Sequence, residues 1–228
     1  MSLMEVPWLD LAIATSIIGS LRVGLIRVPA RASRLGLIFT AIAFTCAFLA
    51  WLSFYEGTDA GTISRWSMQP RIFGGVVFAL DELSAPVVPA VALLHFLTAL
   101  GTTRTKMRSF SFSWSLASEA IRLALFSCKA SWLLVGLLIL CTIPPYFELK
   151  NVGRSRRVYF VHMAAFAILL VLGWAGVSLC GGISPPAFWA VLPLTAAILI
   201  RCGTVPAHCW ITDWFEHASF GIALLFVT

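Results

Sequence analysis

Ionisable side chains inside apolar segments are the residues of this sequence best suited to do chemistry. Glu119 and Arg122 lie near the middle of one such segment. Their i, i+3 spacing places them on one face of a helix, within reach of each other. Such residues form either a structural ion pair or a polar step for protons, and both interpretations stay open. His95, in the preceding apolar segment, either relays protons or donates a hydrogen bond to a neighbouring helix.

A second polar group surrounds an expected break in a helix. Arg201 follows the apolar run 187–200, which at 14 residues is too short to cross a bilayer. Gly203 and Pro206 favour the end of a helix, and His208 lies just beyond them. A short helix that ends beside a fixed cation is typical of the discontinuous helices of ion-coupled transporters. The alternative is an ordinary helix end with Arg201 among the lipid headgroups.

Composition places these residues in a membrane protein. Of the 228 residues, 60% are hydrophobic and 11% are charged, whereas soluble domains carry about 25% charged residues. A segment of about 20 apolar residues spans a bilayer core of about 30 Å. The sequence therefore predicts an all-α polytopic membrane helix bundle with about seven transmembrane helices and a truncated eighth. The predicted spans are 8–26, 35–55, 84–101, 110–128, 131–147, 158–180 and 187–202, with 218–228 as the incomplete eighth.

We expect a single membrane domain over residues 1–228. Residues 1–109 form its N-terminal helices, and residues 110–228 begin a transport-type bundle that contains the broken seventh helix. The run 218–228 rises about 16 Å as a helix, roughly half of a bilayer core. This length predicts that the chain is a fragment, or one piece of a split protein. The alternative is a re-entrant or interfacial turn at the end of a whole chain.

The basic residues predict the orientation of the helices. Most Lys and Arg fall in the first, third and fifth loops, which is the pattern of cytoplasmic loops. We therefore expect the N-terminus to lie outside the cytoplasm, with the chain in the plasma (bacterial inner) membrane. The odd loops carry Arg27, Arg31, Arg34, Arg104, Lys106, Arg108, Lys150, Arg154, Arg156 and Arg157, and the even loops carry Arg65, Arg71 and Lys129.

Other classes of function fit the sequence poorly. The basic residues sit in short clusters between apolar spans, which argues against a nucleic-acid partner. Cys202, His208 and Cys209 form one cluster without a second ligand pair, so we predict no metal site. The sequence shows no nucleotide-binding loop, flavin motif or quinone signature. We therefore expect no cofactor and no catalytic site of its own.

Two motifs carry a family resemblance. The first is Asp81-Glu82-Leu83-Ser84-Ala85, and the second is the segment 201–213, RCGTVPAHCWITD. They resemble the D-x-L-S-A and K-S-A-x-x-P-x-H-x-W-L-x-D sequences of the antiporter-like subunits of NADH-quinone oxidoreductase and of the large subunit of multisubunit cation/proton antiporters. The resemblance covers most of the chain. It implies a membrane subunit of a proton- or cation-translocating complex, with its helix break after Arg201.

The chain departs from this family at charged positions. Arg201 stands in place of the proton-carrying Lys, and a guanidinium with a pKa above about 12 does not readily release a proton. Leu137 and Leu138 stand where the family carries Trp-Glu. Two alternatives to an ion-conducting subunit stay open. One is the membrane component of an ion-driven bicarbonate-uptake complex with a soluble partner on the cytoplasmic side, and the other is a non-conducting scaffold. The expected partners are the lipid bilayer and other membrane subunits of a larger complex.

Overall fold

The computed structural model describes residues 6–56, 77–102, 110–151, 157–180 and 188–217. The regular structure in these ranges is α-helical, apart from one isolated bridge between Phe78 and Cys128, which confirms the all-α part of the predicted fold class. The chain divides into two compact units between Pro144 and Pro145. The predicted incomplete span 218–228 lies outside the described residues.

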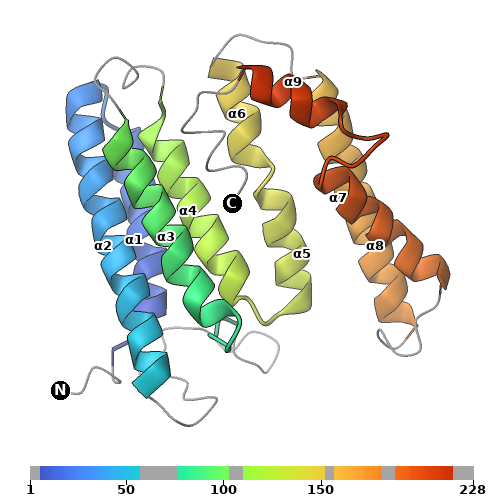
Figure 1. Ribbon diagram of the computed structural model, residues 1–228, viewed down its shortest axis with the longest axis horizontal. Coiled ribbons are helices and arrows are strands. Elements are labelled where there is room, and N and C mark those ends of the chain that lie inside the picture. The colour runs from blue at the N-terminus through green and yellow to red at the C-terminus, as the bar shows by residue number, and fades with distance from the viewer. Residues whose placement is uncertain (1–5, 57–76, 103–109, 152–156, 181–187, 218–228) are drawn as a thin grey trace. The chain divides into compact units, whose positions relative to one another are not determined.

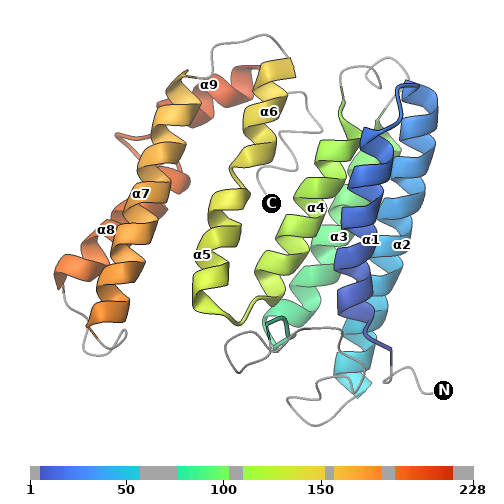
Figure 2. The same ribbon diagram turned by 180° about the vertical axis from the view of Figure 1, so that it is seen from behind.

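The first unit is a bundle in which α1 to α4 lie side by side (Figures 1 and 2). It contains α1 (Trp8–Gly24), α2 (Pro29–Glu56), α3 (Ser84–Gly101), α4 (Phe112–Ser127), α5 (Ser131–Leu140) and the start of α6 (Ile143–Asn151). Helix α4 packs against α1, α2, α3 and α5, so it lies at the centre of this unit's contacts.

Small residues let these helices approach closely. The core cluster of the first unit consists of Ala12, Ile13, Cys46, Ala47, Val88, Ala92, Leu123, Ala124 and Leu137. Helices α1 and α4 are also joined by reciprocal hydrogen bonds: Ser20 Oγ donates to the Ser113 carbonyl at 3.0 Å, and Ser113 Oγ donates to the Ser20 carbonyl at 2.9 Å. Small residues and interhelical hydroxyl bonds are the usual contacts between membrane helices.

The second unit contains α7 (Arg157–Leu179), α8 (Phe188–Arg201) and α9 (Cys209–His217). Helices α7 and α8 make the largest contact within it, over two glycines of α7. A β-carbon on Gly173 would lie 2.6 Å from Leu194 Cγ, and one on Gly176 would lie 3.0 Å from the Trp189 ring. The backbones of α7 and α8 can therefore approach this closely because Gly173 and Gly176 have no side chain.

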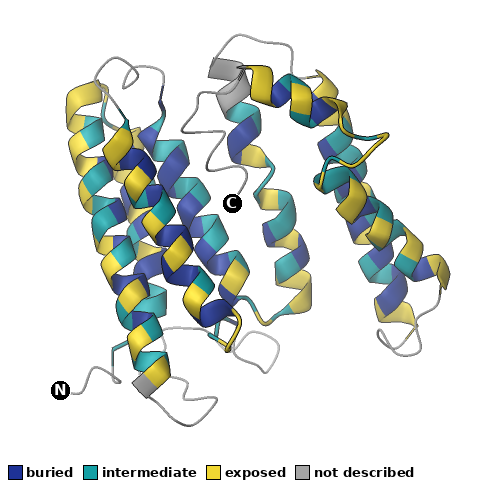
Figure 3. Ribbon diagram, viewed as in Figure 1, coloured by how far each residue is buried: buried dark blue, intermediate teal, exposed yellow. Residues whose placement is uncertain are grey.

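The outer faces of the helices remain apolar. Large hydrophobic side chains are exposed on them, among them Leu21, Ile38, Leu97, Ile168 and Leu172, and Figure 3 shows exposed positions alternating with buried ones along each helix. Among the described residues, three helical stretches are long and apolar enough to cross a bilayer: Pro29–Tyr55, Ser84–Gly101 and Arg157–Leu179. Lipid is the environment that accommodates such faces, and the protein is a multi-pass membrane protein.

Two predicted boundaries differ from the structure. Helix α2 begins at Pro29, six residues before the predicted start at 35, because proline suits the first turn of a helix. The predicted span 131–147 is interrupted, since α5 ends at Leu140 and α6 begins at Ile143. Pro144 and Pro145 have no backbone N–H, so they cannot donate hydrogen bonds to the carbonyls one turn back in α5. They are tolerated in the first turn of α6, where the amides have no partner within the helix.

Candidate functional site

The α3–α4 pair of the first unit holds three of the five candidate residues. Glu119 and His95 are each 0% exposed, and Arg122 is half-buried. Glu119 therefore faces the interior of its unit, as expected for a carboxyl group on a membrane helix. The three side chains come from the middle of their helices and not from the ends.

Arg122 reaches across to the neighbouring helix. Its Nη1 lies 3.4 Å from His95 Nε2, although the two residues are 27 positions apart in sequence. Within the described residues, neither carboxyl oxygen of Glu119 has a hydrogen-bond partner, and neither has His95 Nδ1. Glu119 and Arg122 thus lie one turn apart without a bond between them in this arrangement, so their pairing stays a prediction.

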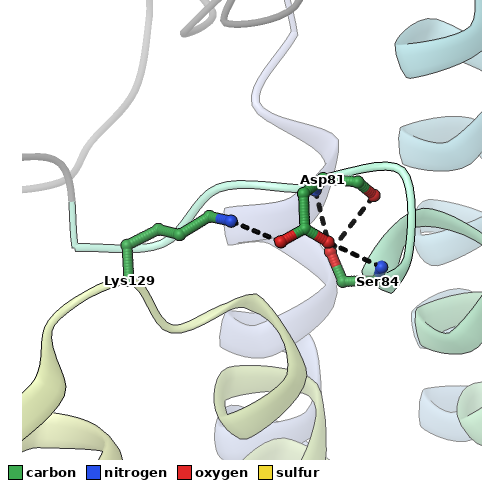
Figure 4. A network of polar contacts seen from close by, with 3 residues as sticks. All are labelled: Asp81, Ser84 and Lys129. Carbon is green, nitrogen blue, oxygen red and sulfur yellow. Dashed lines mark hydrogen bonds and ion pairs between the residues drawn. The ribbon is translucent and has the colours of Figure 1, made fainter. Parts of the chain in front are cut away.

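A capping network fixes the start of α3 (Figure 4). The Ser84 amide donates to Asp81 Oδ1 at 2.7 Å, and the Asp81 amide donates to Ser84 Oγ at 2.8 Å. This reciprocal arrangement is a capping box, which satisfies amides that have no partner inside the helix. The Asp and Ser of the D-x-L-S-A motif are therefore structural partners at the N-terminus of α3.

Lys129 extends this network to the end of α4. Its Nζ lies 2.5 Å from Asp81 Oδ2, and this hydrogen bond, with those from Ser84, holds the pKa of Asp81 well below its ordinary value of 3.8. The backbones are joined as well: the Ala79 amide donates to the Ser127 carbonyl, and the Lys129 amide donates to the Val77 carbonyl. Since the start of α3 is tied to the end of α4, the two helices run antiparallel, and the long Arg122 side chain reaches His95.

In the second unit a helix ends at the position where the sequence predicts a break, after Arg201. Helix α8 ends at Arg201 and α9 begins at Cys209. Gly203 adopts the left-handed conformation with φ of 66°. The Gly203 amide donates to the Ile200 carbonyl and the Thr204 amide to the Leu199 carbonyl, each at 3.1 Å. This pattern is a Schellman motif, in which glycine reverses the chain and closes the last carbonyls of a helix.

A side chain of α9 donates a further hydrogen bond to the end of α8. Trp210 is fully buried, and its indole Nε1 donates to the Ile200 carbonyl at 2.9 Å. The Trp210 ring also packs edge-on against Tyr159 of α7, with ring centroids 5.9 Å apart. Carbonyls freed by a break at membrane depth require such internal donors, because lipid offers none.

Arg201 lies against α7. Its Nη1 donates to Met163 Sδ at 3.5 Å, and its guanidinium carbon is 5.9 Å from the centre of the Phe166 ring. A cation over an aromatic face is stabilised by the ring quadrupole. The charge of Arg201 is therefore held inside the second unit, partly covered by apolar groups.

His208 is separated from Arg201 by the turn. Its side chain is exposed, while its backbone carbonyl accepts the amides of Ile211 and Thr212 at the start of α9. The neighbouring Cys209 thiol lies 3.5 Å from His162 Nε2. Among the described residues, no group of three or more His, Cys, Asp or Glu is placed to hold a metal ion.

The structure thus gathers the candidates into two groups. Arg122 contacts His95 in the first unit, with Glu119 one helical turn from Arg122, and Arg201 lies near the helix end that His208 follows in the second. Leu137, at the position of the Trp in the Trp-Glu of the resembling family, is buried in the core of the first unit. The sequence reasoning did not foresee Met163 and Phe166 beside Arg201. Their i, i+3 spacing marks one face of α7, but no signal showed that Arg201 would meet it.

Comparison with known proteins finds similar sequences among subunits of NAD(P)H-quinone oxidoreductase. The chain is 26% identical over 98% of its length to NAD(P)H-quinone oxidoreductase chain 4 2 of Synechococcus sp. (strain JA-2-3B'a(2-13)) and 27% identical over 97% to chain 4 of Synechococcus sp. (strain WH7803). It is 24% identical over 77% to the chloroplastic chain 4 of Daucus carota. No protein-family model matches the chain. It covers 49%, 45% and 36% of these relatives, so it spans about half the length of the first two.

Proposed function

We propose that this chain is a membrane subunit of an ion-translocating complex of the NAD(P)H-quinone oxidoreductase type. The observation that carries the proposal is the fully buried Glu119 beside the Arg122–His95 contact, in the middle of apolar helices. Ionisable groups at such depth cost several kcal/mol and mark ion paths in membrane proteins. The curated homologues are chain 4 subunits of NAD(P)H-quinone oxidoreductase.

Arg201 supplies a fixed positive charge in this proposal. The guanidinium keeps its proton, so it does not carry one through the membrane. It instead sets the electrostatic potential at the break between α8 and α9, where the backbone is irregular. A fixed cation there stabilises a neighbouring negative charge and repels a second cation, which makes it a gate for ion movement.

The finer architecture belongs to the same proposal. The alternation of basic residues supports about seven spans, with the N-terminus outside the cytoplasm. We place the chain in the plasma (bacterial inner) membrane, as one membrane domain in contact with other membrane subunits. Residues 1–109 would be its N-terminal helices, and residues 110–228 would begin the transport-type bundle. Its ion-path residues would be Glu119, Arg122, Arg201, His208 and His95.

The test is ion movement driven by quinone reduction. Membrane vesicles carrying the native complex are energised with NAD(P)H, and ion uptake is followed with a pH-sensitive or potential-sensitive dye. We expect Arg201→Ala to reduce ion uptake several-fold while the assembled complex remains. Arg22→Ala, at an exposed site in the last turn of α1, is the matched control and should leave uptake unchanged. Full uptake with Arg201→Ala would favour a non-conducting scaffold.

A further inference from the structure

Buried polar groups without partners mark a site between α3 and α4. Within the described residues, the unsatisfied atoms include both carboxyl oxygens of Glu119, the hydroxyl oxygen of Ser115 and His95 Nδ1. Each of these three residues is at most 4% exposed. An ionised carboxylate buried without a donor is far more costly than a neutral carboxyl group. In this arrangement the Glu119 carboxyl group is therefore protonated.

The polar groups form a row along one face of α4. Ser115, Glu119 and Arg122 occupy positions i, i+4 and i+7 of the helix, so each lies about one turn from the next. Arg122 has a long, flexible side chain. It can reach its own helix at Glu119 or the neighbouring helix at His95, and in this structure it is at His95.

We propose that Glu119 is a proton-binding carboxyl group and that Arg122 moves between His95 and Glu119 according to whether Glu119 holds its proton. When the Glu119 O–H bond breaks, the proton passes to water and a carboxylate remains. The Arg122 guanidinium then leaves His95 Nε2 and pairs with that carboxylate. Reprotonation of Glu119 returns Arg122 to His95. The only charge that enters or leaves the site is the proton.

This inference rests on the proposed function and names the proton as the ion bound at Glu119. A metal cation is the less favourable ligand, because it would add a second positive charge one helical turn from the Arg122 position. Ser115, whose hydroxyl lacks a partner one turn before Glu119, marks the direction from which water reaches the carboxyl group. Buried hydroxyls of this kind are commonly satisfied by water.

Other charges on the helices packed against α4 lie away from the middle of the bundle. Helix α5 contains no ionisable residue, and His95 is the one on α3. Asp10 and Arg22 lie in the first and last turns of α1. Helix α2 carries Arg31, Arg34, Cys46, Tyr55 and Glu56, of which Cys46 belongs to the core cluster and the others lie near the helix ends. Arg122 and His95 are thus the groups placed to respond to Glu119.

Infrared difference spectroscopy of the assembled complex tests the inference. At neutral pH the wild-type spectrum should contain a protonated carboxyl band that is absent from Glu119→Gln and shifted in Glu119→Asp. In His95→Phe, Arg122 loses its contact with the imidazole and pairs with the carboxylate, so the band should vanish at neutral pH and return in acid. Glu82→Gln, at an exposed position before α3, should leave the band unchanged.

The outcomes separate this inference from the proposed function. The inference fails if no protonated band depends on Glu119, if His95→Phe leaves the band intact, or if sodium ions remove the band at constant pH. Ion uptake that needs the chain, without such a band, would keep the proposed function and overturn the inference. A Glu119 band that responds to His95→Phe, with ion uptake unchanged in Glu119→Gln, would support the proton site and contradict the proposed function.

Discussion

At the scale of single residues, Arg201 and Glu119 differ in the roles that we propose for them. Arg201 lies against a thioether and an aromatic ring, each of which offers a cation weak stabilisation. Glu119 is enclosed by helices and has no donor within the described residues. In the proposed function, Arg201 therefore provides a permanent charge and Glu119 provides a charge that depends on proton binding. They lie in different units of the chain.

Asp81 gives a residue-scale prediction that depends on pH. Replacing Asp81 with Asn keeps a good capping residue but removes the ion pair with Lys129, and we expect it to lower the free energy of unfolding by up to about 1 kcal/mol at pH 7. Because the folded pKa of Asp81 is below its ordinary value, this contribution is complete above that value. It is lost as the pH falls through the folded pKa.

Thermal unfolding of the two proteins at several pH values checks this. The difference between wild type and Asp81→Asn should stay constant from pH 7 down to about the ordinary value of 3.8 and shrink below it. High salt should shrink it too, since both side chains are largely exposed. A difference that grows in acid, or that salt does not change, would mean that the ion pair does not stabilise the fold.

The sequence singles out candidate site residues but does not reveal their contacts. The candidates stand out because they are ionisable groups inside apolar runs, namely Glu119, Arg122, His95 and Arg201. The residues next to them in the sequence are enough to show this property. The Arg122–His95 contact depends on the register of α3 against α4, which is fixed by pairing between residues 77–79 and 127–129. No periodicity along one helix contains that information.

At the scale of helices, the glycines of α7 make a prediction about packing. Gly173→Ala would place a β-carbon 2.6 Å from Leu194 Cγ and 2.8 Å from its backbone nitrogen. Since a backbone atom cannot move aside, α8 must shift, and we expect a loss of about 1–3 kcal/mol in the free energy of unfolding. The measurement is thermal or denaturant unfolding of the purified protein.

Gly136→Ala is the matched control for this substitution. Gly136 lies inside α5, and a β-carbon there would have nothing within 4 Å. Because alanine favours a helix more than glycine does, we expect this variant to be as stable as wild type or more stable by up to about 1 kcal/mol. Equal stability of Gly173→Ala and Gly136→Ala would show that the close approach of α7 and α8 does not hold the second unit together.

Helix boundaries follow from local chemistry and were largely predictable. The bounds of α3 agree with the predicted 84–101, and α8 stops within one residue of the predicted end. The break after Arg201 was foreseen from Gly203 and Pro206, whose effects are local. The interruption between α5 and α6 was missed because the apolar run continues through it, although Pro144 and Pro145 were visible signals.

At the scale of the whole molecule, the chain spans about half the length of the first two relatives that it matches. Its relatives are chain 4 subunits about twice its length, and its two compact units each contain part of the proposed ion path. In the proposed function, ion movement belongs to an assembled complex, and this chain supplies part of its membrane path.

Ion translocation by the purified complex, with and without this chain, tests the central claim most directly. The complex is isolated through a tag on its quinone-reductase part, from cells with and without this chain, reconstituted in sealed vesicles and supplied with NAD(P)H and a quinone. We predict that the chain co-purifies with a quinone reductase, that vesicles acidify during turnover, and that acidification per quinone reduced falls when the chain is absent. Unchanged acidification per quinone without the chain, or a chain that co-purifies with no quinone reductase, would contradict the account.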